Sequence, residues 1–341
     1  MLKRTEYCDI IIKNYFQRLV MQKIFPNYYN PFKCIASDCK HSCCVGWEIS
    51  IDAKSLKKYA KVKGDLGRKL KENINTEQSS FVLDKNKRCP FLDDNNLCEL
   101  IIAGGDKNLC YICTHHPRFY NFLSGRTEMG LGLSCEEVCR IVLSQKEAVK
   151  FITQGEGNRL TKKQQKIIDL RDKVISTFQD RSLSVNQRIQ TVKKEYGIKL
   201  KGKTVKGWAR FLSNLEILDN EWLNILKLLK TPTKKQQILT LYNDKPNLQI
   251  ELEQFIVYLC YRHLVTSYNE EEFLDRLSFV VLCAELMQII ITASFNLLNE
   301  CDFNKRIDLI RSFSSEIEYS EQNLNDVIDE ITILRGIYEH T

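Results

Sequence analysis

Residues 32–47 read FKCIASDCKHSCCVGW, and this stretch decides how the first third of the chain folds. It contains Cys34, Cys39, Cys43 and Cys44, and its apolar residues recur at the spacing of neither a helix nor a strand. Gly46, after the paired cysteines, is typical of a turn. Because thiolates are preferred ligands of zinc and of iron–sulfur clusters, we expect a loop wrapped around a metal centre.

The rest of the N-terminal third is also rich in cysteine. The chain has 14 cysteines in 341 residues, and most of them precede residue 140: Cys8, Cys34, Cys39, Cys43, Cys44, Cys89, Cys98, Cys110, Cys113, Cys135 and Cys139. Such a cluster either forms disulfides in an exported protein or binds metal in a reducing compartment. The longest apolar run near the N-terminus, residues 10–12, is too short for a secretory signal. We therefore expect a cytoplasmic protein whose thiols bind metal.

The cysteine spacing leaves the metal open. It matches neither a zinc ribbon with two C-x2-C knuckles nor the C-x2-C-x2-C run of bacterial ferredoxins, which favours a centre held by several loops. His41, His115 or His116 could replace one thiolate. The cysteines beyond residue 250 have the small apolar character of core residues.

The length predicts about two domains, and the fold is expected to be mainly α. An N-terminal extension (residues 1–30) precedes a loop-rich, cysteine-rich metal domain with little β structure (31–150) and then an α-helical domain (151–341). Capping boxes are predicted at Thr161–Gln164 and Thr233–Gln236. In the metal domain, residues 48–52 alternate like a short strand, and Asp52 is expected to cap a helix.

Three other function classes find little support in the sequence. Residues 277–298 are apolar but include Glu285, so we expect a buried core helix and no membrane span. The Gly155-Glu-Gly157 segment has no strand pattern before it, which favours a linker over a nucleotide-binding turn. Residues 161–210 are basic but lack the interleaved aromatic residues of a stacking surface, so nucleic-acid binding is not expected.

Several motifs resemble those of one family. They are residues 32–39, Cys43-Cys44-x-Gly46-Trp47, Cys89-Pro-Phe-Leu-Asp93 with Cys98, Cys113-x3-Pro117-Arg118, Leu133-Ser-Cys135, FIVYLCYRH at 255–263 and FSSEIEYSEQN at 313–323. In this order they resemble the flagellin lysine-N-methylase family. The cysteine motifs are also similar to a broader group of zinc- or iron-chelating domains.

The resemblance implies methyl transfer from S-adenosylmethionine to lysine side chains of flagellin, by a cytoplasmic protein that carries an iron–sulfur cluster, expected to be 4Fe-4S, with zinc as the alternative. The implied ligands are Cys34, Cys39, Cys43, Cys44, Cys89, Cys98, Cys113 and Cys135. Which four share one centre stays open, and eight could hold two metals. Glu136 stands where the family usually has proline, and Cys110 and Cys139 are additional to its pattern.

Fewer residues are indicated for catalysis. Glu316, Glu318 and Tyr319 are candidates because they lie in the late motif, although a solvated acidic helix face would give the same pattern. Trp47, expected chiefly to pack on the metal loop, and Arg118, which could neutralise an anionic cluster, are candidates for cofactor contacts. The alternative function is a zinc- or iron-chelating protein without catalysis. The oligomeric state is not predicted.

Overall fold

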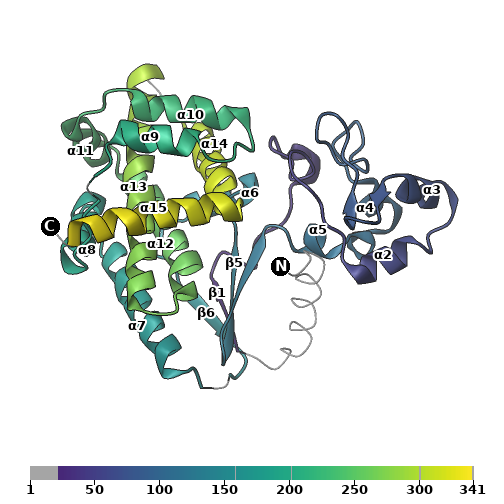
Figure 1. Ribbon diagram of the computed structural model, residues 1–341, viewed down its shortest axis with the longest axis horizontal. Coiled ribbons are helices and arrows are strands. Elements are labelled where there is room, and N and C mark those ends of the chain that lie inside the picture. Colours follow the sequence, from purple (N-terminus) through teal and green to yellow (C-terminus); the bar gives the residue numbers. More distant parts are fainter. Residues whose placement is uncertain (1–21, 158, 201, 299–300, 340–341) are drawn as a thin grey trace.

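The computed structural model describes residues 22–157, 159–200, 202–298 and 301–339. Most of the expected N-terminal extension, with Cys8, lies outside these residues. A small cysteine-rich domain stands beside a larger helical body, and a sheet lies on the side of the body that faces the small domain (Figure 1). The predicted mainly α fold with little β structure is confirmed.

The sheet ties together segments that are distant in sequence. Its strand order is β4-β5-β1-β6, with β1 (Gln22–Pro26), β4 (Arg118–Phe122), β5 (Arg126–Leu131) and β6 (Phe151–Gln154). β1 pairs in parallel with β5, so that Ile24 lies opposite Glu128, and antiparallel with β6. A strand does precede Gly155, contrary to the sequence reading. No helix follows it until residue 162, so the segment lacks the strand–turn–helix context of a nucleotide-binding loop.

The small domain consists of short elements joined by loops. They are η1 (Ala36–Asp38), α2 (Ala53–Tyr59), α3 (Gly64–Glu72), β2 (Ile74–Asn75), β3 (Ser80–Phe81), α4 (Glu99–Gly104), η2 (Asp106–Asn108) and α5 (Tyr111–His115). The predicted cap is confirmed, because Asp52 Oδ1 accepts from the backbone N–H of Ser55 at 2.9 Å. Its Oδ2 also accepts from the N–H of Tyr111, which holds the starts of α2 and α5 together.

The predicted strand at residues 48–52 is wrong. Only Ser50 forms a β-bridge there, to Ser80. The chain enters the α2 cap at Asp52, which leaves too few residues for a ladder.

The helical body supplies most of the chain's secondary structure. Its helices are α6 (Glu136–Leu143), α7 (Lys162–Phe178), α8 (Val185–Glu195), α9 (Val205–Ser213), α10 (Asn220–Lys230), α11 (Lys235–Asp244), α12 (Pro246–His263), η3 (Leu264–Thr266), α13 (Glu270–Leu298), α14 (Phe303–Phe313), the π-helical turn η4 (Ser314–Glu318) and α15 (Glu321–Glu339). The capping box at Thr161 and Gln164 is confirmed. The predicted box at Thr233 and Gln236 does not form. The helix begins one residue later, where Gln237 accepts from the N–H of Lys234 and no side chain caps the helix in return.

Helix α13 is the one candidate membrane span among the described residues. Glu270–Leu297 is long and apolar enough to cross a bilayer, but 89% of its most apolar window is buried inside the protein. It packs against α10, α12 and α15, which confirms the predicted core helix.

Two separate hydrophobic cores divide the chain differently from the expected domain boundaries. The core of the helical body includes Phe25 from β1, Leu131 from β5 and Val138 from α6. Residues 22–32 and 118–150 therefore pack with the helices. The smaller core holds residues between 49 and 110. The division follows the pairing of β1 with both β5 and β6, which draws these segments into one sheet on the body.

Candidate metal centre and domain junction

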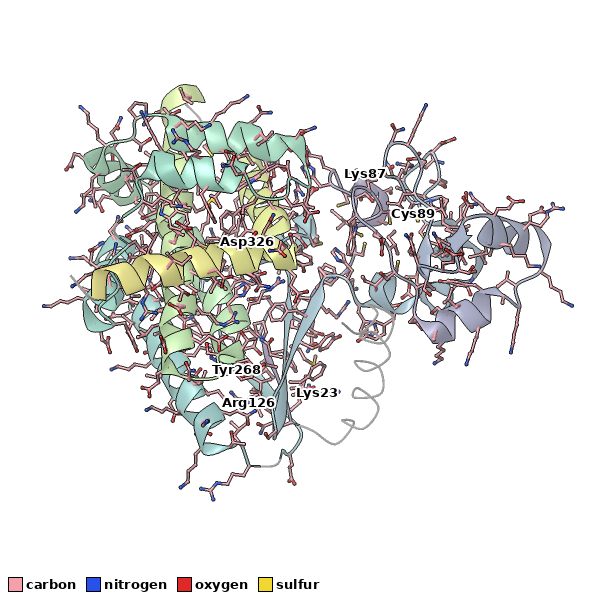
Figure 2. All side chains as sticks on the ribbon, viewed as in Figure 1. Lys23, Lys87, Cys89, Arg126, Tyr268 and Asp326 are labelled. Carbon is pink, nitrogen blue, oxygen red and sulfur yellow. The ribbon has the colours of Figure 1, made fainter. Side chains whose placement is uncertain are left out.

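One group of cysteines surrounds the core of the small domain. This inner thiol group consists of Cys44, Cys89, Cys98, Cys110 and Cys113. Cys89 and Cys110 are buried core members, and the other three pack against that core. The N–H of Cys89 donates to the carbonyl of Cys44 at 2.8 Å, and the sulfurs of Cys110 and Cys113 are 3.5 Å apart. Figure 2 shows Cys89 on the side of the small domain that faces the body.

Burial and neighbouring thiols oppose ionisation of Cys89 and Cys98. Burial, with smaller contributions from the thiols of Cys44, Cys98 and Cys110, raises the pKa of Cys89 to about 12. Burial also raises the pKa of Cys98, which feels Cys44 and Cys110 as well. A bound cation reverses this repulsion, because a coordinated thiol is deprotonated outright.

A second group lies where the small domain meets the body. This junction thiol group consists of Cys34, Cys39, Cys43 and Cys135. The Cys39 thiol is 3.7 Å from a carboxylate oxygen of Glu136, and the same oxygen accepts from the N–H of His41. Burial raises the pKa of Cys39 to about 12, with contributions from Glu136, Cys135 and Cys34. Burial raises the pKa of Cys135 to about 11, and Cys34 contributes to that rise.

The donor set fits a thiolate metal site in chemistry and number. Soft sulfur suits zinc and iron–sulfur clusters, and four thiolates complete either. Across the described parts of the chain, no three His, Cys, Asp or Glu side chains converge closely enough to hold an ion in their present rotamers. His41 pairs with Asp308, and His115 bonds the carbonyl of Tyr111, so both rings are engaged elsewhere.

The motifs at residues 255–263 and 313–323 contact each other inside the body. Glu318 is fully buried, and its Oε1 accepts from Tyr258 at 3.0 Å and from His263 Nε2 at 2.7 Å. Arg262 lies 3.5 Å from the same oxygen. Burial opposes ionisation of Glu318, but Arg262 and His263 outweigh it and lower the carboxyl pKa. This network fixes the π-helical turn against α12.

Glu316 holds a loop in place. Its two carboxylate oxygens accept from the N–H groups of Leu218 and Asp219 at 3.0 and 2.6 Å. Asn323, from the same motif, bonds the backbone of Glu216. Burial raises the pKa of Glu316, and the two backbone donors oppose that rise. The motif thereby positions the start of α10.

We expect Glu316→Gln to destabilise the protein by about 2 kcal/mol, because the new amide meets one backbone donor with its own N–H and loses a charge-assisted hydrogen bond. Urea unfolding of both proteins measures the difference. Glu321→Gln, at an exposed position of the same motif, serves as the matched control and should leave stability within about 0.5 kcal/mol of wild type. Equal stability of all three proteins would contradict the assigned role.

Tyr319 is the one partly exposed member of the three catalytic candidates. Its ring lies 6.3 Å from that of His116, which in turn lies 5.4 Å from that of Trp47. Trp47 donates to the carbonyl of Cys43. This aromatic row, Trp47–His116–Tyr319, therefore runs from the junction thiols to the late motif. Gly132 permits the approach, since a Cβ there would lie 1.7 Å from the Tyr319 hydroxyl.

His116 is the member of the aromatic row that sequence reasoning undervalued. Its Nε2 is buried without a hydrogen-bond partner among the described residues, and burial lowers the pKa of the ring to about 4. The ring is therefore neutral near pH 7. In the sequence, only the position of His116 within the Cys113-x3-Pro117-Arg118 motif indicated a role.

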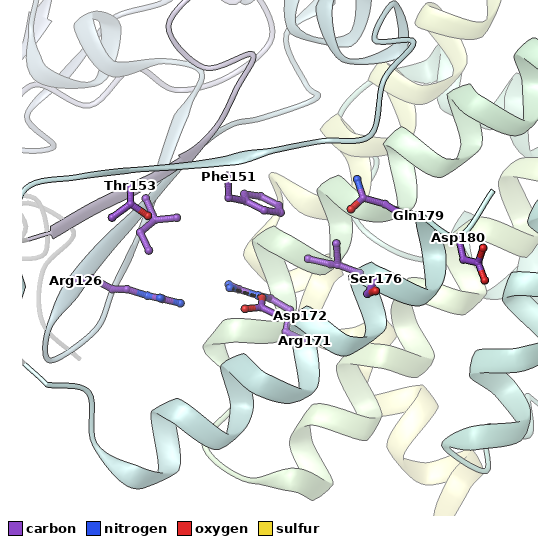
Figure 3. Close-up of a pocket in the computed structure, with 10 residues that line it drawn as sticks. Arg126, Phe151, Thr153, Arg171, Asp172, Ser176, Gln179 and Asp180 are labelled. Carbon is purple, nitrogen blue, oxygen red and sulfur yellow. Dashed lines mark hydrogen bonds and ion pairs between the residues drawn. The ribbon is translucent and has the colours of Figure 1, made fainter. Parts of the chain in front are cut away.

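The clearest cavities lie away from the thiols. One of about 590 Å³ is lined by Phe151, Thr153 and residues of α7 (Figure 3). Its arginines are already paired, because Arg171 binds Glu128 and Asp172. Another of about 400 Å³ is lined by Arg118 and several aromatic residues of the sheet. The Arg118 guanidinium packs over the rings of Tyr29 and Phe32, at 5.8 and 5.4 Å from their centroids.

Comparison with known proteins places the helical body in a family. The model of the FliB lysine N-methylase C-terminal domain matches residues 154–339, more than half of the chain. The chain is 29% identical over 164 residues to the lysine-N-methylases of Salmonella typhimurium and Salmonella choleraesuis, covering 42% of this chain and 40% of each relative. It is 28% identical over 137 residues to the flagellar biosynthetic protein FliU of Salmonella muenchen, covering 36% of this chain and 78% of that protein.

The matched segments thus span well under half the length of the two lysine-N-methylases. No solved structure matches the chain significantly. The family match covers the π-helical turn, α12 and their shared buried network. The chain therefore belongs to the FliB lysine N-methylase family.

Proposed function

We propose that this protein methylates lysine side chains of flagellin in the cytoplasm, with S-adenosylmethionine as donor and an iron–sulfur cluster bound by its N-terminal thiols. The observation that carries the proposal is the family match over residues 154–339. The names of the relatives, lysine-N-methylase and flagellar biosynthetic protein, support the reaction and the substrate.

The reaction makes a simple demand on the protein. The donor supplies an electrophilic methyl group on a sulfonium. A neutral lysine amine attacks this methyl group. The new C–N bond forms as the C–S bond breaks, and the electron pair of the C–S bond stays on the sulfur. The amine, whose ordinary pKa is about 10.4, must first lose a proton. A site that desolvates the ammonium or places a proton acceptor beside it promotes this loss.

Tyr319 is the proposed contact to the substrate amine. Glu316 and Glu318 are occupied by the buried contacts described above, whereas Tyr319 is partly exposed at the domain junction and its hydroxyl makes one long hydrogen bond, to the Pro117 carbonyl at 3.4 Å. We expect Tyr319→Phe to lower kcat about tenfold while metal content stays unchanged, a modest effect for loss of a proton-transfer group. Tyr268→Phe, at an 82% exposed position, is the control. Unchanged kcat in Tyr319→Phe would remove Tyr319 from the proposal.

The thiols support an iron–sulfur cluster in two ways. All the proposed donors are cysteines, and a cluster accepts donors spread over several irons, whereas zinc requires four sulfurs about 2.3 Å from one ion. Because the cysteines come from several separate loops of the small domain, the cluster is the better fit. Iron, zinc and acid-labile sulfide analysis after anaerobic purification tests this, and zinc without sulfide would replace the cluster by a zinc site.

Methyl transfer is tested with purified flagellin and S-adenosylmethionine. Mass spectrometry should show methyl groups added to flagellin lysines, and donor titration should show saturable binding. The second candidate, a metal-chelating protein without catalysis, is supported by the separate core of the small domain. It predicts full metal content, no saturable donor binding and unmodified flagellin, and that combination would replace the methylation proposal.

A further inference from the structure

The sheet turns one of its faces toward the small domain (Figure 1). Arg118, Tyr120 and Phe122 alternate along β4, so their side chains lie on the same face. Phe122 pairs with Thr127 of β5, and Thr127 pairs with Lys23 of β1. Residues directly opposite one another in a ladder share a face, so Thr127 and Lys23 belong to this face as well.

A cavity of about 400 Å³ lies between this face and the small domain. The sheet residues just named line one side, and Asp106 of η2 and His115 of α5 line the other. The volume is in the range of small-molecule sites, about 300–1,000 Å³, and such sites are common where two domains meet. Both domains therefore contribute to one ligand-sized cavity.

The charges in this cavity are not paired with each other. Within the described part of the chain, Arg118 forms no ion pair with a carboxylate, and Asp106 forms none with a cation. The rings of Tyr29 and Phe32 hold the Arg118 guanidinium by its flat face, which leaves its N–H edge for a ligand. The cavity lined by α7 differs, because its arginines are already paired. A ligand that carries both an anionic and a cationic group complements Arg118 and Asp106.

Aromatic rings follow Arg118 along β4. The rings of Tyr120 and Phe122 are nearly parallel, with 6.1 Å between their centroids. The His115 ring approaches that of Tyr120 edge-on from the small domain, also at 6.1 Å. Such rings stack on the flat face of a nucleobase and attract a cationic group. A simple inorganic anion would make no use of them.

We propose that this cavity binds the methyl donor, an adenosyl amino acid that combines a carboxylate, an ammonium, a sulfonium and an adenine. The Arg118 guanidinium binds the carboxylate, and Asp106 accepts from the ammonium or from the ribose hydroxyls. The sulfonium and the adenine lie along the rings of Tyr120 and Phe122. The inference rests on the proposed function, whose donor it assigns to particular residues.

The orientation of the donor follows from the position of Tyr319. The Tyr319 hydroxyl donates to the carbonyl of Pro117, the residue before Arg118, at 3.4 Å. With its carboxylate on Arg118, the donor has its sulfonium nearer to Tyr319 than its adenine. The adenine then lies by Phe122, where Lys23 donates to a ring nitrogen. This arrangement brings the methyl group toward the proposed contact to the lysine amine.

Direct measurement of donor binding tests the assignment. Equilibrium dialysis with labelled S-adenosylmethionine gives the Kd of wild type, Arg118→Gln and Asp106→Asn after anaerobic purification. The Kd should rise at least tenfold in Arg118→Gln and several-fold in Asp106→Asn, because each loses a charged hydrogen-bond partner of the ligand. Metal content should be the same in all three proteins.

Arg68→Gln is the matched control, because the Arg68 side chain is 75% exposed on α3. It should keep the wild-type Kd. Asp106 is itself exposed, so Asp106→Asn tests the assignment even if loss of the Arg118 packing disturbs the fold. Wild-type donor affinity in both cavity variants would overturn the inference.

A second ligand isolates the aromatic contact. S-Adenosylhomocysteine has the same end groups but no positive charge on its sulfur. Tyr120→Leu should weaken binding of S-adenosylmethionine about threefold more than binding of S-adenosylhomocysteine. Tyr120→Phe keeps a ring and should leave the ratio of the two affinities unchanged. Equal weakening of both ligands by Tyr120→Leu would overturn the placement of the sulfonium on Tyr120.

The inference and the proposed function fail in different ways. Saturable donor binding and methylated flagellin, with unchanged donor affinity in both cavity variants, would leave the proposed function standing and end the inference. Variants that raise the KM for flagellin while the donor Kd stays unchanged would assign the cavity to the substrate lysine, which also ends it. A wild type with no saturable donor binding and unmodified flagellin would end the proposed function, and the inference with it.

Discussion

Stripping the metal under anaerobic conditions is expected to unfold the small domain while the helical body stays folded. The inner thiols belong to or pack against a core of ten buried residues, whose largest side chains are Phe91, Tyr59 and Phe81. Domains of this size often need a metal or disulfides for stability, and binding of a structural zinc ion supplies about 10–16 kcal/mol in small peptides. Without a cation, the crowded thiols contribute no comparable stabilisation.

Hydrogen exchange measures this outcome region by region. After chelation, amides that are bonded within the small domain, such as those of Cys89 and Phe81, should exchange at the rate of an open chain. Amides of α12 and α13 should keep their protection, because their core is separate. The control is the same chelator treatment followed by metal reconstitution, which should restore protection. A metal-free small domain that stays protected would show that its thiols are not structural ligands.

Local signals were the part of this fold that the sequence specified well. The capping box at Thr161 and the cap at Asp52 each depend on residues within one helical turn. Most of helix α13 was predicted as a buried core helix from the apolar character of residues 277–298, because a helix that is apolar all round is buried. In these cases the interactions that define the element join residues that are close together in the sequence, so a local pattern is enough to predict them.

Long-range pairing could not be predicted in this way. β1 joins β5 through partners such as Gln22 and Arg126, and no residue near either strand specifies that register. The same holds for the bond between Asp52 and Tyr111 and for the contact of His263 with Glu318. The pairing of β1 with β5 helps to place residues 118–150 on the body, whereas composition alone groups them with the preceding cysteines.

The candidate site was predicted in composition but not in arrangement. Cysteine density and the family resemblance identified the eight candidate thiols. The spacing of the cysteines does not predict where each thiol lies in the fold. The arrangement depends on long-range contacts such as the bond from the Cys89 N–H to the Cys44 carbonyl, which no local pattern specifies. The late motif was read as a solvated acidic face or a catalytic site. In the structure, Glu316 and Glu318 instead form buried hydrogen bonds. The sequence pattern could not predict them, because their partners lie on helices and loops that are distant in the sequence.

Acid should weaken the domain junction through His116. Burial lowers the pKa of this ring to about 4, against about 6.5 in an unfolded chain. Between these values the unfolded state binds a proton that the folded state does not, so stability rises with pH and falls as pH drops from 6.5 toward 4. At about 1.36 kcal/mol for each unit of pKa difference, the loss amounts to about 3 kcal/mol.

His116→Phe isolates this contribution, because it keeps a ring between Trp47 and Tyr319 but cannot titrate. Urea unfolding of both proteins at pH 8, where both rings are neutral, sets the baseline difference between them. As pH falls to 4, wild type should lose about 3 kcal/mol relative to the variant. Acid release of metal affects both proteins alike and so cancels in the comparison. A difference that stays constant with pH would mean that His116 takes up its proton as readily in the folded protein as in the unfolded chain, which the buried, unpartnered Nε2 argues against.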